Sequence, residues 1–502
     1  MNRIFEKVRM KKPRMSAFDL SHDKKMSLKM GALYPCFHEE VLPGDQFSVR
    51  SDMMIKLAPM VAPVMHNIDA YIHYFFVPNR IVWDQWEEFI TGGEEGTSVV
   101  SVPTVDYGPT ASSIGKLGDY FGLPPITAAT ALKLNALPFR AYTEIWNEYY
   151  RDQNLTDPID YTSASWAGTG WRDLLVRCWE KDYFTSALPW AQRGPEVTIP
   201  MDINGATELT REDGTGWITG SGSLRADPAG GSTTSKNLQV NDSVDGWVDA
   251  RLDNANSNIE LDIRELRRTA RLQEFFEKAA RIGSRYKEQI MGYFGQDVGD
   301  ARLDRPEYLG GGKQPVVISE VLNTSATATE PQGNMAGHGL SVGSSAKFKQ
   351  QFREHGHVIG ILSVIPRTAY WQGIDRRFTR DDRFDYFWPE FANLGEQEVK
   401  NHELYQPPAA TSIDEGTFGY QQRYAEYKHK QSSVHGDFKD SLKFWQMGRE
   451  FSSAPALNET FVTSDPTDRI FAVQDGTDTL YAHVYHDFKA RRPIPYFSDP
   501  KL

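Results

Sequence analysis

The stretch IDAYIHYFFV at residues 68–77 decides the fold class of this chain. Apart from Asp69 and His73 it is apolar at every position, and it stops at Pro78. A short run of aromatic and branched residues bounded by proline is typical of a strand, and apolar side chains in both alternations indicate a sheet covered on both faces. The segment HVIGILSVI at residues 357–365, which ends before Pro366, is predicted as another strand.

Working outward, the sequence predicts further strands at both ends and helices between them. Residues 47–57 and 480–488 have strand composition. Residues 80–90 place Trp83 and Trp86 at helical spacing, and residues 262–291 carry the longest apolar stripe of helical period. No alternation of strands with helices and no internal repeat is visible, which argues against doubly wound sheets and solenoids. We therefore expect an all-β fold, an eight-stranded antiparallel jelly roll whose long interstrand insertions contain short helices.

Two polar stretches interrupt this pattern. In residues 201–260, Gly, Ser, Thr, Asn and Asp supply 33 of 60 positions, which is too polar to bury a core of its own. This stretch is predicted as a long exposed loop with a few hairpins, and a loop of that length is functional or disordered. Residues 323–346 are predicted to behave likewise.

The charge distribution separates the N-terminus from the rest of the chain. The 502 residues carry 55 Lys and Arg against 67 Asp and Glu, a net charge of −12, so any contact with a polyanion must be local. Residues 1–15 contain six basic residues and one acidic residue. We expect residues 1–25 to form a basic arm and residues 26–502 a single domain with insertions. A solvated tail without a partner is the alternative.

Composition also limits the class of protein. The two cysteines, Cys36 and Cys178, exclude a disulfide framework and leave one bridge at most. No apolar run approaches the length of a membrane span, and no secretory signal follows the first residues. We expect a folded protein that is made in the cytoplasm and does not enter a membrane.

Two glycine-rich patterns match functional motifs but lack their context. GLSVG at residues 339–343 fits the G-x-S-x-G elbow of serine hydrolases, with Ser341 as nucleophile, yet NMAGH at 334–338 is no buried strand. GGGK at residues 310–313 lacks the Ser or Thr of a phosphate loop and is predicted as a turn. A hydrolase that uses Ser341 stays open as an alternative function.

Neighbouring histidines and carboxylates give no complete site. Four pairs stand close in sequence: His355 and His357, His483 and His486, Glu39 and Glu40, and Asp381 and Asp382. Neither histidine pair has a third metal ligand at a defined spacing. Adjacent carboxylates in an extended chain point apart, so the carboxylate pairs could hold an oxygen-bound cation at most. We predict no catalytic residue, no cofactor and no metal site.

Aromatic residues are unusually placed. The chain has 12 Trp, 22 Tyr and 27 Phe, and many tryptophans lie in irregular segments punctuated by Pro or Gly. Large aromatic side chains in such segments suit protein–protein interfaces, although small cores under long loops must account for most of them. The tryptophans concerned are Trp166, Trp171, Trp179, Trp190, Trp371, Trp388 and Trp445.

Several long blocks, in order, resemble one known family. They are EVLPGD at residues 40–45, LAPM at 57–60, HYFFVPNR at 73–80, DYFTSALPW at 182–190, ARLDRPEYLGG at 301–311, PRTAY at 366–370 and FGYQ at 418–421. With these blocks the chain resembles the major capsid proteins of Microviridae, particularly the gokushovirus-like branch, from about residue 20 to the C-terminus. The likeness thins in residues 201–260.

The resemblance implies a structural protein without enzymatic activity. Copies of one jelly-roll subunit would form a small T=1 icosahedral shell around a circular single-stranded DNA genome of a bacteriophage, assembled in the host bacterial cytoplasm. Residues 201–260 correspond to a variable surface loop thought to face the host receptor. A small basic DNA-packaging protein, a pilot protein and a scaffolding protein are the other expected partners.

For the genome, we expect nonspecific contact through counterion release. The residues expected to touch DNA are Arg3, Lys7, Arg9, Lys11, Lys12 and Arg14 of the arm, and Arg491 and Arg492 near the C-terminus. A carbohydrate- or receptor-binding β-sandwich that forms no shell is the competing function, because jelly rolls also serve lectins.

Overall fold

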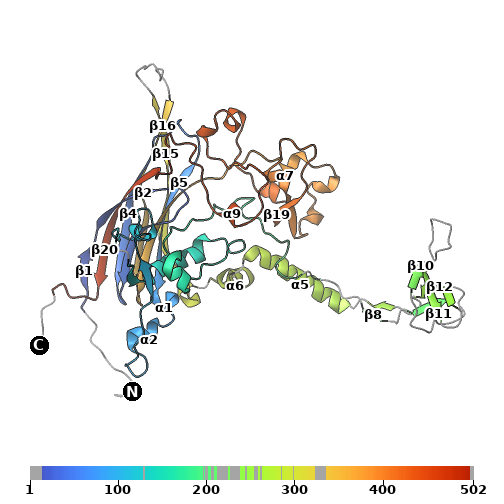
Figure 1. The fold of residues 1–502 in the computed structure, drawn as a ribbon, viewed down its shortest axis with the longest axis horizontal. Coiled ribbons are helices and arrows are strands. Elements are labelled where there is room, and N and C mark those ends of the chain that lie inside the picture. The colour runs from blue at the N-terminus through green and yellow to red at the C-terminus, as the bar shows by residue number, and fades with distance from the viewer. Residues whose placement is uncertain are drawn as a thin grey trace. The chain divides into compact units, whose positions relative to one another are not determined.

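The computed structural model describes residues 14–497 except 128–129, 196, 198–201, 205–207, 212–223, 227–237, 243–245, 254–257, 261–262, 284, 298 and 323–334. The chain divides into two compact units, Met1–Ala191 with Ile282–Leu502, and Gln192–Arg281. The larger unit contains a sandwich of two antiparallel sheets, in which the residues of the predicted strands lie (Figure 1).

One sheet has six strands in the order β1-β20-β4-β16-β15, with β2 also paired to β20. In Figure 1 the red strand β20 lies between the blue strands β1 and β4. The strands of this sheet are β1 (Ser16–Asp19), β2 (His22–Leu28), β4 (Gln46–Leu57), β15 (Val317–Leu322), β16 (Met335–Gln351) and β20 (Leu480–Arg492).

The other sheet has four strands in the order β14-β5-β17-β3. Its strands are β3 (Tyr34–Val41), β5 (Ile68–Pro78), β14 (Glu307–Pro315) and β17 (Gly356–Pro366). Every pairing within both sheets is antiparallel. The prediction of strands at residues 47–57, 68–77, 357–365 and 480–488 is therefore confirmed.

The main core lies between the two sheets. Strand β4 alternates buried and exposed positions, so it turns one face to this core and the other to solvent. Strands β5 and β17 are buried along almost their whole length, as the apolar sequence of residues 68–77 predicts. One side of this sheet packs in the main core, and the other side, with Phe75 and Ile361, packs in a second core.

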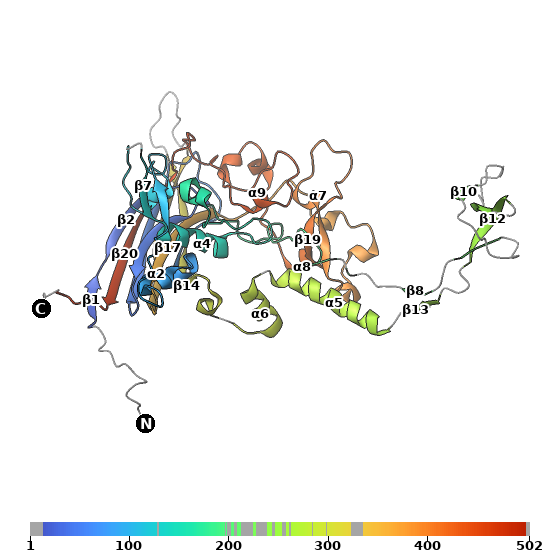
Figure 2. The same cartoon turned by 60° about the horizontal axis from the view of Figure 1, so that its bottom comes forward.

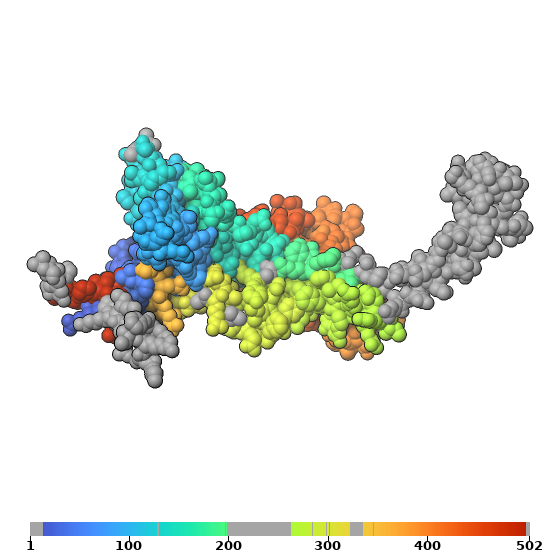
Figure 3. All heavy atoms as spheres, turned by 90° about the horizontal axis from the view of Figure 1, so that it is seen from below, coloured from blue at the N-terminus to red at the C-terminus, as the bar shows by residue number. Residues whose placement is uncertain are grey.

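The second core is formed between the four-stranded sheet and the insertion after β5. Helix α4 (Leu137–Ile145) contacts β5 and β17, and its Phe139 and Tyr142 pack in the same core as Phe75 and Ile361. Figure 2 shows α4 beside β17. In the space-filling view of Figure 3 the blue-to-green residues of this insertion form one continuous body. The insertion therefore covers the face of the sheet that would otherwise expose apolar side chains.

The remaining elements of the larger unit are short. Two hairpins pair β6 (Thr104–Tyr107) with β7 (Leu132–Asn135) and β18 (Glu396–Lys400) with β19 (Thr417–Gln422). The α-helices are α1 (Asn79–Val82), α2 (Trp86–Thr91), α3 (Leu117–Tyr120), α6 (Tyr286–Phe294), α7 (Asn401–Leu404), α8 (Ala425–Lys428) and α9 (Glu459–Val462). The shorter turns are η1 (Trp146–Tyr150), η2 (Trp166–Gly170), η3 (Asp300–Leu303), η4 (Arg376–Phe378), η5 (Arg383–Asp385), η6 (Pro389–Phe391), η7 (Gly436–Lys439) and η8 (Lys443–Trp445).

The smaller unit consists of short strands and one long helix. Strands β9 to β12 form a four-stranded sheet in the order β10-β11-β12-β9, and β13 pairs with β8. The elements are β8 (Asp202–Asn204), β9 (Glu208–Arg211), β10 (Leu224–Ala226), β11 (Leu238–Asp242), β12 (Gly246–Asp253), β13 (Asn258–Glu260) and α5 (Ile263–Ile282), whose last residue belongs to the larger unit.

Four local predictions differ from the structure. The helix expected at residues 262–291 is two helices, α5 and α6, because Gly283 between them adopts φ +102°. The helix expected at 80–90 is broken into α1 and α2 at Trp83, which is extended and buried in the second core. The loop expected at 323–346 is wrong for residues 335–346, which form β16; residues 323–334 lie outside the described residues.

The turn expected at GGGK, residues 310–313, is also wrong, because these residues lie within β14. The register between β14 and β5 shifts between Tyr308 and Gly310, and Gly310 adopts φ +147°. A Cβ atom on Gly311 would lie 2.5 Å from the carbonyl oxygen of Ile72. The glycines therefore permit an irregular strand to approach β5 closely.

Candidate functional site

An exposed group of aromatic and aliphatic side chains lies in the insertion between β17 and β18. Phe378 is 80% exposed and Leu394 is 61% exposed, although both are large and apolar. We call this group the aromatic surface; its members are Phe378, Phe384, Tyr386, Phe387, Trp388 and Leu394. Contiguous exposed apolar residues of this kind are uncommon on monomers and mark interaction sites.

Short-range hydrogen bonds fold the segment that carries the aromatic surface. Asp375 accepts a hydrogen bond from the backbone N–H of Arg377 (2.9 Å) and binds the same residue's guanidinium through both carboxylate oxygens, at 2.9 and 2.7 Å. Asp385 accepts from the backbone N–H groups of Asp381 (3.2 Å) and Asp382 (3.1 Å), which lowers the pKa of its carboxyl group. These contacts fix turns η4 and η5 without a regular helix.

A buried ion pair lies beneath this segment. The guanidinium of Arg380 is 3.3 Å from the carboxylate of Glu426, and the two side chains are only 7% and 9% exposed. The amide of Gln397 donates a hydrogen bond of 2.6 Å to Glu426, and Arg380 also lies 4.5 Å from the ring centroid of Tyr427. A buried pair with these additional partners holds its elements in one arrangement, because moving either residue leaves the other charge unpaired.

Tyr424 connects the residues around this ion pair to the aromatic surface. Its backbone N–H donates to Gln397 Oε1 (3.0 Å), and its ring packs against Phe387 with centroids 4.9 Å apart. Its hydroxyl donates to the carbonyl oxygen of Tyr386 (3.3 Å) and accepts from the backbone N–H of Trp388 (3.2 Å). The aromatic surface is thus preorganised, which lowers the entropy cost of binding a partner.

A cavity of about 1000 Å³ lies next to the aromatic surface. Its wall includes Arg376 and Phe378 together with Tyr183, whose hydroxyl donates to Glu403 (3.0 Å). Burial raises the pKa of the Glu403 carboxyl group, although the backbone N–H of Lys400 and the guanidinium of Arg376 act in the opposite direction. The guanidinium of Arg376 lies 3.5 Å from the Glu403 carboxylate, so these two charged groups of the wall pair with each other.

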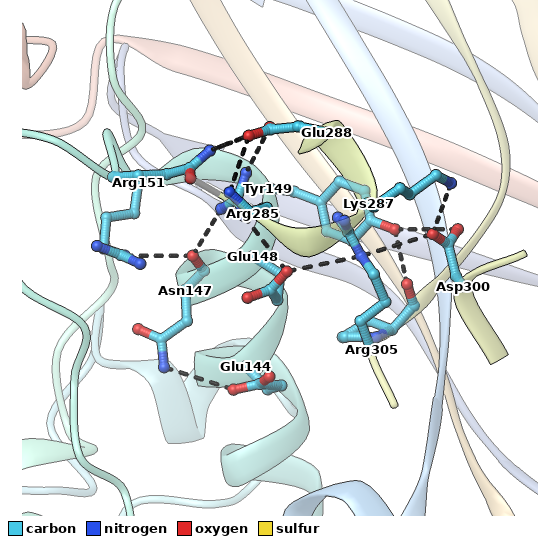
Figure 4. A network of polar contacts seen from close by, with 12 residues as sticks. Glu144, Asn147, Glu148, Tyr149, Arg151, Arg285, Lys287, Glu288, Asp300 and Arg305 are labelled. Atoms are coloured by element: carbon cyan, nitrogen blue, oxygen red, sulfur yellow. Dashed lines mark hydrogen bonds and ion pairs between the residues drawn. The ribbon is translucent and has the colours of Figure 1, made fainter. Parts of the chain in front are cut away.

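A second polar network fixes the chain where it enters the larger unit after the smaller one (Figure 4). Glu148 in η1 lies 3.4 Å from Arg285 and 3.6 Å from Arg305, and Asp300 lies 3.5 Å from Arg305 and 2.8 Å from Lys287. These residues come from η1, η3, α6 and the segments that flank α6. The network therefore ties residues 285–305 to the helical insertion after β5.

The structure describes three of the eight residues expected to touch DNA. Arg14 and Arg491 are exposed. The side chain of Arg492 is 16% exposed and lies 2.9 Å from Glu39 and 3.3 Å from Asp45, so its charge already has partners. The other five lie outside the described residues: Arg3, Lys7, Arg9, Lys11 and Lys12.

The serine motif does not form a nucleophile elbow. Ser341 is buried in the interior of β16, where its hydroxyl donates to the carbonyl oxygen of Pro315 (2.8 Å) and accepts from Gln314 Nε2 (2.6 Å). An elbow requires an exposed serine at a strand-to-helix turn, and neither condition holds. The structure gives this serine a structural role between β14 and β16.

The histidines and cysteines named in the sequence analysis make structural contacts or are free thiols. His357 is buried and its ring stacks on that of His38, with Nδ1 and Nε2 at 3.2 Å, and His486 is hydrogen-bonded to Ser51 (2.6 Å). Cys36 and Cys178 are both free thiols. Within the described part of the chain no group of three His, Cys, Asp or Glu residues could hold a metal ion, and no helix is long and apolar enough to cross a membrane.

Among the tryptophans that the sequence analysis singled out, only Trp388 is exposed, at 46%, and it belongs to the aromatic surface. Trp166 and Trp171 are buried in the second core, and Trp179 forms a small cluster with Tyr71. The interface interpretation of the irregular tryptophans therefore applies to one of seven, and small cores account for the best buried ones.

The fold and this site define a class. An antiparallel β-sandwich whose long insertions carry an exposed aromatic surface has the architecture expected of a protein that binds other proteins. The chain belongs to the capsid protein (F protein) family, which matches residues 7–502. The resemblance to Microviridae capsid proteins of the gokushovirus-like branch is confirmed.

Relatives whose printed name is capsid protein VP1 align with nearly the whole chain. The chain is 36% identical to capsid protein VP1 of Chlamydia phage 1, over 97% of this chain and 96% of the relative. It is 34% identical to capsid protein VP1 of Bdellovibrio phage phiMH2K and 28% identical to that of Spiroplasma virus 4, each over 97% of this chain and 95% of the relative. The protein is a structural major capsid protein of a virion, and a carbohydrate-binding sandwich that forms no shell is not favoured.

Proposed function

We propose that copies of this chain assemble into a closed T=1 icosahedral shell around the circular single-stranded DNA genome of a bacteriophage. The observation that carries the self-association is the aromatic surface, whose six large side chains are exposed while the groups beneath them are buried and paired. Aromatic anchors on a preorganised frame supply most of the binding energy at protein interfaces. Identical subunits then close a shell through repeated copies of the same contacts.

The proposed subunit is an eight-stranded jelly roll. Strand order supports this: β2-β20-β4-β16 in one sheet and β14-β5-β17-β3 in the other. Along the chain, these eight strands alternate between the two sheets except where β5 is followed by β14 in the same sheet. Such crossing between facing sheets is the connectivity of two interleaved Greek keys. Strands β1 and β15 extend the larger sheet beyond the eight.

The proposed organisation of the chain follows from this. Residues 1–25 form a basic arm whose last part, residues 16–25, joins the six-stranded sheet in β1 and at the start of β2. Residues 26–502 form one jelly-roll domain with insertions, and residues 201–260 form a variable surface loop that contacts a host receptor. The polar network around Glu148 and Arg305 holds residues 285–305, which follow that loop in the chain, within the larger unit.

The proposed genome contacts are the arm and the end of β20. Arg14 and Arg491 are exposed and support this proposal; Arg492 contributes less, because Glu39 and Asp45 already neutralise it. Deletion of residues 2–14 should lower the DNA content of purified particles, because fewer cations then release counterions from the genome. Particles with unchanged genome content would remove the arm from the proposal.

The remaining partners are proposed from the family alone. A small basic DNA-packaging protein shares the DNA, a pilot protein and a scaffolding protein serve entry and assembly, and assembly takes place in the host bacterial cytoplasm. No enzymatic activity and no cofactor are part of the proposal.

Hydrogen exchange tests the proposed interface directly. Amides of residues 376–394 should exchange more slowly in assembled particles than in free subunits, because a partner then covers the aromatic surface. Amides of the buried strand β17 serve as the internal reference, since they are protected in both states. Equal exchange of residues 376–394 in both states would contradict the assignment of this surface.

A further inference from the structure

The solvent face of the six-stranded sheet carries a group of basic side chains that the aromatic surface and the arm do not explain. The outward positions of three adjacent strands supply Arg50 from β4, Lys347 and Lys349 from β16, and Lys489 and Arg491 from β20, all exposed. We call these five residues the basic face.

Strand register brings these residues together. Lys349 and Lys489 lie on either side of Ser48 in one row, and Lys347 lies directly opposite Arg50 in the next row. Adjacent strands are about 4.8 Å apart and alternate residues along a strand about 6.8 Å apart, so the basic face spans about 10 by 14 Å.

Three acidic side chains nearby offset part of the charge of the five cations of the basic face. Asp487 lies 3.8 Å from Lys489 and directly opposite Arg50, Asp52 lies 3.4 Å from Arg50, and Asp19 is opposite Lys489 on β1. Within the described residues, no ion pair involves Lys347, Lys349 or Arg491.

The placement of Lys347 against Arg50 points to a function. Like charges directly opposite each other on one face of an antiparallel pair destabilise the sheet. In a chain of net charge −12, such a local excess of positive charge is better explained by an anionic partner, whose binding relieves the repulsion, than by the stability of the isolated fold.

Aromatic side chains continue the same face. Tyr481 and Tyr485 on β20 are 51% and 41% exposed and point outward in the same alternation as Lys489. Proteins that bind single strands without sequence preference combine cations along the backbone with aromatic rings on which bases stack. Duplex DNA does not present its bases to such a face.

The basic face is also continuous with the arm. Ser16 at the start of β1 pairs with Arg492, so the chain that precedes β1 leaves the sheet at the end where Arg491 lies. Arg14, two residues before β1, is exposed at this end.

We propose that the basic face, with Tyr481 and Tyr485, is a binding surface for single-stranded DNA and forms part of the genome-facing lining of the shell. This inference rests on the proposed function, since a shell with a single-stranded genome supplies the ligand. It assigns the DNA to a particular side of the sandwich and to residues outside the arm.

The test measures binding of a fluorescent 20-nucleotide oligo(dT) to the full-length protein across a range of salt concentrations. The triple variant Lys347→Gln/Lys349→Gln/Lys489→Gln should bind about tenfold to a hundredfold more weakly near 0.1 M salt. The slope of log affinity against log salt should fall by about 2, because each lost phosphate contact on a single strand removes about 0.7.

The matched control is Lys133→Gln/Lys430→Gln/Lys439→Gln, which removes the same charge from exposed lysines elsewhere. It should keep the affinity and the slope. The variant Tyr481→Thr/Tyr485→Thr should bind oligo(dT) at least about fivefold more weakly but bind inorganic polyphosphate as the parent does, because only the oligonucleotide offers bases.

Equal loss in the two lysine variants, or no loss in either, would overturn the basic face as a binding surface. Loss of polyphosphate binding in the tyrosine variant would overturn the stacking role. Electron micrographs of the same preparations distinguish failure of this inference from failure of the proposed function. Shells that form, with DNA binding that does not depend on the basic face, refute only the inference. The absence of shells refutes the proposed function.

Discussion

Arg380 and Glu426 form an ion pair of 3.3 Å that is almost completely removed from solvent, beneath the most exposed apolar surface of the insertion after β17. A buried charge pair contributes little net stability, but the loss of one partner is costly. Its position indicates that this insertion is shaped for a partner, because a monomer gains nothing from rigid aromatic side chains in water.

The first prediction concerns this pair. Arg380→Met leaves the carboxylate of Glu426 buried without a cation and should destabilise the insertion by about 3–5 kcal/mol. The double variant Arg380→Met/Glu426→Gln should recover part of this loss, because a neutral amide needs no cation. Hydrogen exchange of amides 380–394 measures both; equal exchange in the single and double variants would show that the charge is not the cause.

The second prediction concerns the aromatic surface. Phe378→Ser/Leu394→Ser removes two mainly exposed side chains, so the free subunit should keep its stability within about 0.5 kcal/mol. The yield of assembled particles should fall at least about tenfold, because the interface loses buried apolar anchors. Val99→Ser/Ile114→Ser removes apolar side chains that are even more exposed and serves as the control with unchanged yield. Normal assembly of the first variant would exclude these two side chains as anchors.

The third prediction concerns the network in Figure 4. Arg305, with a side chain 11% exposed, bridges Glu148 and Asp300 and lies 4.8 Å from the ring centroid of Tyr149. Arg305→Met leaves two carboxylates without this cation, so amides of residues 285–305 should exchange at least about tenfold faster. Arg302→Met, at an exposed position, should leave the exchange unchanged. Equal rates in both variants would show that the network does not hold residues 285–305 against η1.

The fourth prediction concerns acid stability. Burial lowers the pKa of His38 to about 4 and that of His357 to about 3. The charge of Lys24 lowers the pKa of His38 further, and His38, once protonated, does the same to the pKa of His357. The unfolded chain therefore takes up protons on these residues below about pH 6.5, whereas the folded chain does so only below about pH 4. The free energy of unfolding should fall as the pH decreases from 6.5 to 4, by up to about 1.4 kcal/mol per pH unit for each histidine.

Chemical unfolding at several pH values measures this slope. The variant His38→Gln/His357→Gln should show a smaller dependence on pH than the parent over the same interval. His435→Gln, at an exposed position, is the control and should keep the parental slope. A double variant with the parental slope would assign the acid sensitivity to other groups.

The fold was predictable where local and tertiary preferences agree. Residues 68–77 are apolar in both alternations, and the structure buries both faces of β5 between two cores. The helix at 262–291 was predicted as continuous because its apolar stripe crosses Gly283 without a change of phase. The break depends on the left-handed conformation of that glycine and on Glu288, which accepts from the backbone N–H of Arg285.

The site was less predictable, because its parts are distant in sequence. Trp388 was recognisable as an aromatic residue in an irregular segment, but its neighbours in the segment gave no period. Arg380 and Glu426 are 46 residues apart, and their ion pair joins the insertion after β17 to α8, so no local sequence spacing predicts it. The alignment of the basic residues across β16, β4 and β20 could not be predicted either, because part of β16 has the composition of a polar loop.

The native mass of the purified protein tests the central claim most directly. Light scattering and electron micrographs of the same sample should show closed spheres, and a T=1 shell of sixty 56.9 kDa subunits has a protein mass of about 3.4 MDa. A protein that stays at the mass of one subunit, or of a small oligomer, under conditions where the aromatic surface is intact would contradict the account.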